Sequence, residues 1–339
     1  MPPNKPASKI PTSNQEPTLS DVALQRESLM INRREFIQYA AAAGAAVALP
    51  AVSSTGSAQE YKTRPHKAII GSVPTQEQME QWRACGVEGM EIRGPITLEE
   101  AEQTRKLADK VGFRVHSLMG GGSKERLEVA SILGCDSVLI VPGRVSKVPM
   151  PQPWEFKIQF DEKTNELLSV VDGDNEPYKA YIAAHNEQMQ HSREFLESLL
   201  PFAEKYNVRL CVENVWNNMW VKPEFAANFI RSFNSPFVKA YYDVGNHVKY
   251  SNPLDWFDVL GKDIYKIHLK DFKLNENGQG GRFVMIMEGS VDWKALRGKL
   301  EDIGYNGWMT VELDGGTLTI EEQARRMDLI LEGKPLENT

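Results

Sequence analysis

Four short apolar segments of the chain each end in a side chain that can bind a metal ion. These side chains are Glu213, Asp243, His268 and Glu312. Three carboxylates and one imidazole form an oxygen-rich ligand set, which suits Mn²⁺, Mg²⁺ or Co²⁺ and suits Zn²⁺ less well when no thiolate is present. If the segments were neighbouring strands, the four side chains would share one divalent ion, with Mn²⁺ the first choice.

Each of these residues also has an ordinary structural explanation. Asp243 could cap the next helix, His268 could be a buried histidine with a backbone partner, and the glutamates could pair with neighbouring lysines. Four such residues at equivalent strand ends favour one shared site, because each isolated buried carboxylate would need its own compensating partner.

The elements that would position these residues alternate between β-like runs and amphipathic helical stretches from about residue 61 onward. Eight such units in residues 61–332 predict a (β/α)8 TIM barrel, in which the carboxyl ends of all strands meet at one mouth. A doubly wound dinucleotide-binding sheet is the competing fold, but no GxGxxG follows the first strand. The strand candidates are KAIIGSV, GVEGMEIRG, FRVHSLMGG, CDSVLIVPG, VRLCVENVW, VKAYYDVGN, IYKIHLKDF and WMTVELDGG.

Two segments interrupt the repeating pattern. Residues 154–178 contain two alternating runs around DEKTNE and predict a β-hairpin inserted after the fourth strand, where it would cover the mouth. Residues 274–293, after the seventh strand, are long and Gly-rich and could fold over a ligand. Residues 333–339 form a predicted C-terminal tail.

Composition narrows the classes of partner. The formal net charge is −7 and no basic block offsets it, so nucleic acid and anionic membranes are poor partners and a small molecule is favoured. The three cysteines, Cys85, Cys135 and Cys211, lie in apolar contexts without a CxxC pattern, which argues against a disulfide framework or a thiolate zinc site.

The N-terminal region resembles a twin-arginine export signal. Arg33 and Arg34 precede an Ala-rich run that is shorter than the ~20 residues of a membrane span, and small residues follow it. We therefore expect a signal peptide over residues 30–58 with cleavage after Ala58, no stable membrane anchor, and a periplasmic or other extracytoplasmic location. Residues 1–29 are expected to be disordered or a non-native extension.

Four motifs resemble the xylose-isomerase-like TIM barrel superfamily of sugar isomerases and epimerases. They are ENVWN at 213–217, YDVGN at 242–246, HLKDF at 268–272 and EGSVDW at 288–293. The resemblance implies that Glu213, Asp243, His268 and Glu312 are the metal ligands and that the two glutamates are also the catalytic acid/base pair. Many members of the superfamily have a histidine three residues after the metal-binding aspartate, where this chain has Asn246.

Further polar and aromatic residues near the strand ends are candidates for binding substrate. Structural roles such as burial, an ion pair or packing under a loop are the alternative for each of them. These candidates are Glu91, His116, Trp216, Asn217, Asn246, Lys270 and Glu288.

The function that these residues and the resemblance predict is a divalent-metal-dependent sugar isomerase or epimerase. It would remove a proton next to a carbonyl of a free or oxidised sugar and pass through an enediolate. A lyase or hydratase that cleaves 3-keto-glycosides by β-elimination is the enzymatic alternative, and a catalytically silent sugar-binding barrel is the non-enzymatic one. The sequence leaves the oligomeric state open, a homo-oligomer included.

Overall fold

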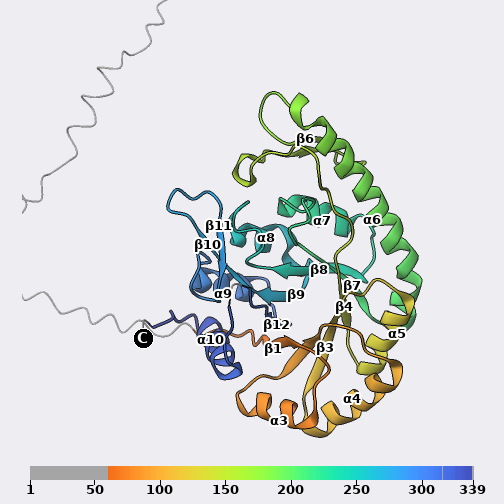
Figure 1. Ribbon diagram of the computed structural model, residues 1–339, viewed down its shortest axis with the longest axis vertical. Coiled ribbons are helices and arrows are strands. Elements are labelled where there is room, and N and C mark those ends of the chain that lie inside the picture. Colours follow the sequence, from red (N-terminus) through yellow and green to blue (C-terminus); the bar gives the residue numbers. More distant parts are fainter. Residues whose placement is uncertain (1–59, 315, 338–339) are drawn as a thin grey trace, which may run out of the picture. The chain divides into compact units, whose positions relative to one another are not determined.

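Eight parallel strands close into a barrel in the computed structural model, which describes residues 60–314 and 316–337 (Figure 1). The last strand pairs with the first, and every neighbouring pair is parallel. This arrangement confirms the predicted (β/α)8 fold. The expected extension 1–29 and signal 30–58 lie outside the described residues. The barrel strands are β1 (His66–Gly71), β2 (Gly89–Ile92), β3 (Arg114–Met119), β4 (Ser137–Ile140), β7 (Arg209–Glu213), β8 (Val238–Asp243), β9 (Ile264–Leu269) and β12 (Trp308–Val311).

Helices follow the barrel strands and pack around the outside of the barrel (Figure 1). Their ends have the expected capping residues: before α4, Thr97 and Glu100 form a capping box, and Gly112 ends that helix with a left-handed φ of 67°. The helices are α3 (Gln76–Ala84), α4 (Leu98–Val111), α5 (Lys124–Leu133), α6 (Lys179–Tyr206), α7 (Pro223–Arg231), α8 (Pro253–Leu260), α9 (Trp293–Asp302) and α10 (Ile320–Glu332).

The main apolar core lies between the strands and the inner faces of these helices. Leu127 of α5, Leu196 of α6, Phe225 of α7 and Met327 of α10 are all buried in it. Burial of this surface stabilises the barrel as a scaffold, and the strand ends are thereby held in fixed positions.

A β-bulge interrupts the pairing of β2 with β3. Met90 pairs with Val115 and Glu91 with Ser117, so His116 is the extra residue on β3. A bulge changes the direction in which the following side chains point. Here His116 contacts Trp308 and Thr310 of β12 while Ser117 contacts Glu91 of β2, which places both consecutive side chains on the inside of the barrel.

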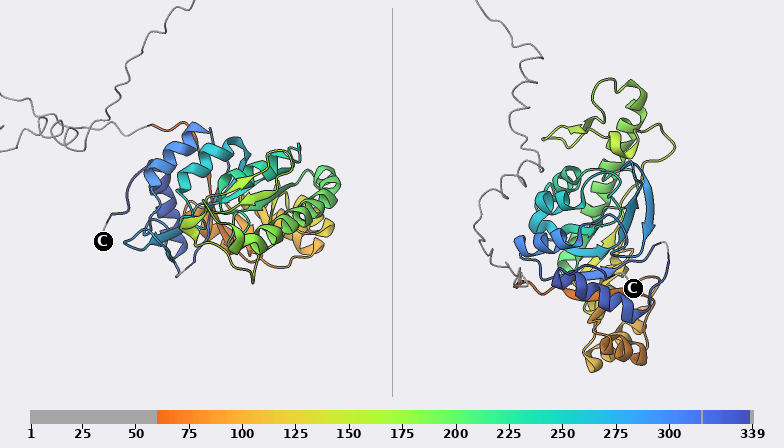
Figure 2. Two further views of the ribbon diagram at one scale, coloured as in Figure 1. Left: turned by 90° about the horizontal axis from the view of Figure 1, so that it is seen from above. Right: turned by 90° about the vertical axis from the view of Figure 1, so that its left-hand side faces the viewer.

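The predicted hairpin after the fourth strand is present as β5 (Gln159–Phe160) and β6 (Leu167–Ser169). It leads into α6, and Figure 2 shows the hairpin and the start of this helix projecting from the barrel. Asn186 of α6 bonds both backbone groups of Leu167, and Phe160 packs against Phe225. These contacts fasten the hairpin to α6 and α7.

The Gly-rich segment after the seventh strand forms a second hairpin, β10 (Asp271–Leu274) with β11 (Gly281–Val284). The buried carboxylate of Asp271 holds the following loop, because it accepts bonds from the backbone N–H groups of Gly289 and Val291 and from the indole of Trp293. An added Cβ at Gly289 would lie 2.1 Å from this carboxylate, so the close approach requires glycine. Part of the predicted loop is therefore a paired element with a fixed position.

The helices and the cysteines of the described residues add two findings. None of the helices within residues 60–314 and 316–337 combines the length and the apolar character of a membrane span. The thiols of Cys85, Cys135 and Cys211 are all free, and the last two are buried as small apolar side chains.

Candidate metal centre

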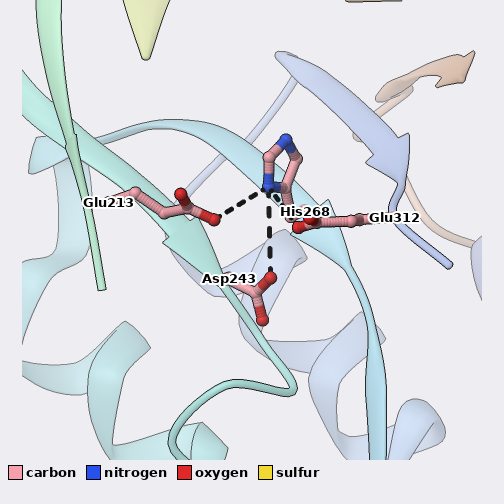
Figure 3. A group of neighbouring side chains, drawn as sticks. All are labelled: Glu213, Asp243, His268 and Glu312. Atoms are coloured by element: carbon pink, nitrogen blue, oxygen red, sulfur yellow. Dashed lines mark hydrogen bonds and ion pairs between the residues drawn. The ribbon is translucent and has the colours of Figure 1, made fainter. Parts of the chain in front are cut away.

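The four strand-end residues meet at the mouth of the barrel. One ligand atom from each of Glu213, Asp243, His268 and Glu312 lies within 4.8 Å of the others. Nδ1 of His268 lies 3.2 Å from a carboxylate oxygen of Glu213, 3.0 Å from one of Glu312 and 4.0 Å from one of Asp243 (Figure 3). Strands β7, β8 and β9 and the end of β12 thus direct one imidazole nitrogen and three carboxylates at a common point.

The local structure after β8 explains the YDVGN motif. Oδ1 of Asp243 accepts bonds from the backbone N–H groups of Gly245 and Asn246, which closes a tight turn. An added Cβ at Gly245 would lie 2.7 Å from the carbonyl carbon of Lys270, so only glycine fits here. The side-chain amide of Asn214 bonds both backbone groups of Asp243. One oxygen of Asp243 therefore caps the turn, while Oδ2 stays directed at the centre.

The donor set fits a divalent cation. Oδ2 of Asp243 and Oε2 of Glu312 are buried and make no hydrogen bond of good geometry, although the ammonium of Lys270 lies 3.5 and 3.2 Å from them. Buried carboxylate oxygens of this kind cost free energy unless positive charge compensates them. With His268 neutral and the three carboxylates ionised, as they would be around a bound cation, the ammonium of Lys270 leaves two negative charges at the centre, which one divalent cation would neutralise. Carboxylate oxygens with one imidazole are ligands typical of Mn²⁺, Mg²⁺ and Zn²⁺.

The two glutamates of the centre have opposite pKa shifts. Burial raises the pKa of Glu213 above its usual value, although the hydrogen bond with His268 opposes the rise. Burial alone would raise the pKa of Glu312 too, but the charges of His268 and Lys270 outweigh it and hold this pKa well below the usual value. Burial also raises the pKa of Asp243, to about 7. Carboxylates whose environments separate their pKa values are suited to different roles in proton transfer.

The second ring nitrogen of His268 points away from the centre and toward the barrel interior (Figure 3). Nε2 lies 2.7 Å from Oε2 of Glu91, a residue of β2 that is 0% exposed. The expected contact of Glu91 with substrate does not fit this position, because both its carboxylate oxygens have buried partners, His268 and Ser117.

Lys270 and Asn246, two of the candidates for binding substrate, lie beside the carboxylates. Nζ of Lys270 is 3.5 Å from Oδ2 of Asp243 and 3.2 Å from Oε2 of Glu312, and it donates a bond to Oδ1 of Asn246. Burial works against the charge of Lys270, but Asp243 and Glu312 together raise its pKa above the usual value. The ammonium group is therefore a fixed positive charge at the mouth.

His116 and Glu288 lie elsewhere than expected. His116 is 1% exposed inside the barrel, where it stacks on Trp308 and bonds Thr310. Glu288 is exposed and pairs with Arg326 of α10 at 2.8 Å. The bulge in β3 and the fold of the loop after β11 place these two side chains away from the four ligands.

Trp216 and Asn217 shape the loop after β7. The indole N–H of Trp216 donates to the backbone carbonyl of Asn246, and its ring contacts Lys249, at 3.3 Å from the centroid, and Phe283 of β11. The carboxamide of Asn217 is buried and bonds backbone groups. Both residues therefore stabilise the loops around the mouth, and the contact of Phe283 with Trp216 packs the second hairpin against these loops.

Three residues that the sequence reasoning did not single out also belong to this region. Arg93 lies 3.5 Å from Oε1 of Glu312, Asn214 joins the turns after β7 and β8, and Phe283 contacts Trp216. Arg93 could have been found, because it lies near the end of the second predicted strand and directly follows β2. The contacts of Phe283 depend on a hairpin that the Gly-rich sequence did not reveal.

A model of the xylose isomerase-like TIM barrel family matches residues 79–330 of the chain. The chain belongs to this family. Several solved structures have the same barrel fold, although their sequences are less than 20% identical to this chain.

A D-tagatose 3-epimerase-like protein is 17% identical, with a TM-score of 0.57 over 79% of this chain and 97% of that one. The 3-keto-D-glucoside 4-epimerase from E. coli is 13% identical, with a TM-score of 0.57 over 79% and 99%. The IOLI protein, solved with a zinc atom, is 16% identical, with a TM-score of 0.57 over 78% and 96%.

Two further comparisons match only part of the chain. A model of the twin-arginine translocation signal matches residues 30–50, which indicates export by the Tat route. An uncharacterised protein of Methanocaldococcus jannaschii is 24% identical over 133 residues, 38% of this chain and 44% of that protein. The chain thus spans less than half the length of this relative.

A cleft of about 590 Å³ lies apart from the metal centre of this barrel. It is lined by the insertion, including Phe156 and Phe160, and by the starts of α7 and α8, including Lys222 and Ser251. None of the four candidate ligands lines it, so the cleft and the candidate metal centre are separate features.

Proposed function

We propose that the protein is a divalent-metal-dependent sugar isomerase or epimerase. The observation that carries this proposal is the arrangement of Glu213 and Glu312, which approach Nδ1 of His268 from opposite sides at 3.2 and 3.0 Å (Figure 3). Two carboxylates on opposite sides of one position can remove a proton from one face of a planar intermediate and return it to the other.

The chain's own groups have defined roles in this proposal. Glu213, Asp243, His268 and Glu312 would hold the cation, which would polarise the carbonyl of a bound keto-sugar and lower the cost of removing the proton beside it. An oxygen of Glu312 accepts that proton, and Glu213 delivers one to the opposite face. The ammonium of Lys270 stabilises negative charge that develops on the sugar oxygen.

The family and its structural relatives support this class of reaction. Two of the similar structures are described as an epimerase or as epimerase-like, and a third holds zinc. The signal at residues 30–50 favours a free or oxidised sugar met outside the cytoplasm, in the periplasm or another extracytoplasmic space, over a phosphosugar. Mn²⁺ is our first choice of cation because carboxylate oxygens dominate the ligand set.

A test that separates the candidate functions uses the purified full chain loaded with Mn²⁺. The chain is incubated in deuterated water with a panel of ketoses and 3-keto-glycosides and followed by NMR. We expect deuterium at the carbon next to the carbonyl while the sugar stays intact. Release of the aglycone would instead favour the β-elimination lyase, and the absence of exchange and cleavage across the panel would favour a sugar-binding protein.

A further inference from the structure

The back of the metal-binding imidazole faces a completely buried carboxylate. Glu91 of β2 and His268 of β9 are both 0% exposed, and Oε2 of Glu91 lies 2.7 Å from Nε2 of His268. At this distance the two atoms share a proton in a strong, charge-assisted hydrogen bond.

The bulge in β3 holds Glu91 in place. Because His116 is an extra residue, Ser117 comes opposite Glu91, and its hydroxyl donates to Oε1 at 2.8 Å. One carboxylate oxygen is thus fixed by a hydroxyl and the other is free to accept from the imidazole. The side chain is 0% exposed, and each of its two carboxylate oxygens has a buried partner.

This geometry selects one form of the imidazole. A carboxylate can only accept, so the shared hydrogen belongs to Nε2 of His268. Carboxylates also face Nδ1, so the choice between the two nitrogens is made when a cation lies between Glu213, Asp243 and Glu312. The ring then keeps its hydrogen on Nε2 and presents the lone pair of Nδ1 to that cation. A histidine that binds a metal through one nitrogen commonly donates its other N–H to such a partner, which orients the ring and makes it a better ligand.

We propose that Glu91 is a positioning residue of the metal centre: it fixes the tautomer and the ring orientation of His268 and leaves Nδ1 as the ligand atom. This inference rests on the proposed metal centre. It replaces contact with the substrate as the role of Glu91. It also explains how the buried negative charge of the Glu91 carboxylate is tolerated, because the imidazole of His268 and the cation bound to that ring would together compensate it.

The test measures Co²⁺ binding to the purified, metal-free full chain by the visible absorption of the bound ion. Loss of such a partner typically weakens metal binding ~10–100-fold, and we expect a loss of this size in Glu91→Gln together with an altered Co²⁺ spectrum. Glu88→Gln is the matched control, because Glu88 precedes the same strand and pairs with His66 at the surface. This control should bind Co²⁺ as the wild type does.

Three results would count against the inference. Wild-type affinity and spectrum in a folded Glu91→Gln variant would refute the role of Glu91 alone, whereas a wild-type chain that binds no Co²⁺ would refute the metal centre and this role with it. If Glu91→Gln fails to fold, ¹⁵N NMR of the Zn²⁺-loaded wild type decides. A proton on Nε2 of His268 supports the inference, and a proton on Nδ1 overturns it.

Discussion

Replacing Glu312 by Gln separates the two roles proposed for this side chain. The amide keeps the length of the side chain and one carbonyl oxygen, so it can still contribute to cation binding beside Glu213, Asp243 and His268. It cannot accept a proton at neutral pH. We therefore expect Glu312→Gln to retain most of its metal and its fold while proton abstraction fails.

The size of the effect follows from the position of Glu312. Its Oε2 lies 3.0 Å from Nδ1 of His268 and 3.2 Å from Nζ of Lys270, and a carbonyl oxygen there can still accept from the lysine. Loss of a positioned base typically costs ~10²–10⁴ in rate, which corresponds to about 3–5 kcal/mol in the activation free energy. The assay is deuterium exchange into the keto-sugar that the panel identifies, with metal content measured on the same sample.

The control is Glu102→Gln, because Glu102 is an exposed residue of α4 on the outside of the barrel. It should exchange deuterium at the wild-type rate. The reasoning is refuted if metal-replete Glu312→Gln also exchanges at that rate, since the base would then lie elsewhere. If Glu312→Gln loses its metal altogether, the separation of ligand from base is wrong.

Three further predictions address the metal centre, export and stability. Asp243→Ala and His268→Ala should each lose the divalent metal in elemental analysis, and full occupancy in both would contradict a shared ion. Replacing Arg33 and Arg34 by lysine should leave an uncleaved precursor in the cytoplasm on immunoblots, and normal processing would contradict the export signal. Burial lowers the pKa of His185 from 6.5 to about 4, so the unfolded chain binds more protons between these values and stability falls as the pH drops. This group accounts for a loss of about 2 kcal/mol in the free energy of unfolding between pH 7.5 and 5. In urea titrations, the free energy of unfolding of His185→Gln should fall by about 2 kcal/mol less than that of the wild type between pH 7.5 and 5. An equal fall in both proteins would show that His185 is not the group responsible.

The barrel and the positions of the four candidate ligands could be predicted because they depend on local patterns. A largely apolar run such as VKAYY, in which only Lys239 is charged, is typical of a strand buried on both faces, and the turn residues after Asp243 end it abruptly. In a barrel all such ends meet at one mouth. The structure places Glu213, Asp243, His268 and Glu312 together for this reason.

The partners of the remaining candidates depend on register and tertiary contact, which local patterns do not contain. The period-2 pattern of a strand gives no sign that His116 is an extra residue, and the bulge turns both His116 and Ser117 inward. The direction of the Glu91 side chain follows from that register.

Pro201 inside α6 would have argued against a continuous helix, yet this helix extends from Lys179 to Tyr206.

The pairing of β1 with β12 has a consequence for the order in which the protein folds. These strands are separated by more than 230 residues, so the edge of β1 stays unpaired until the end of the barrel has been synthesised. Glu312 directly follows β12, and the last ligand therefore arrives with the strand that closes the barrel. A cation that binds all four residues would stabilise the closed barrel over the open one. The proposed metal would then support the final step of folding as well as the chemistry.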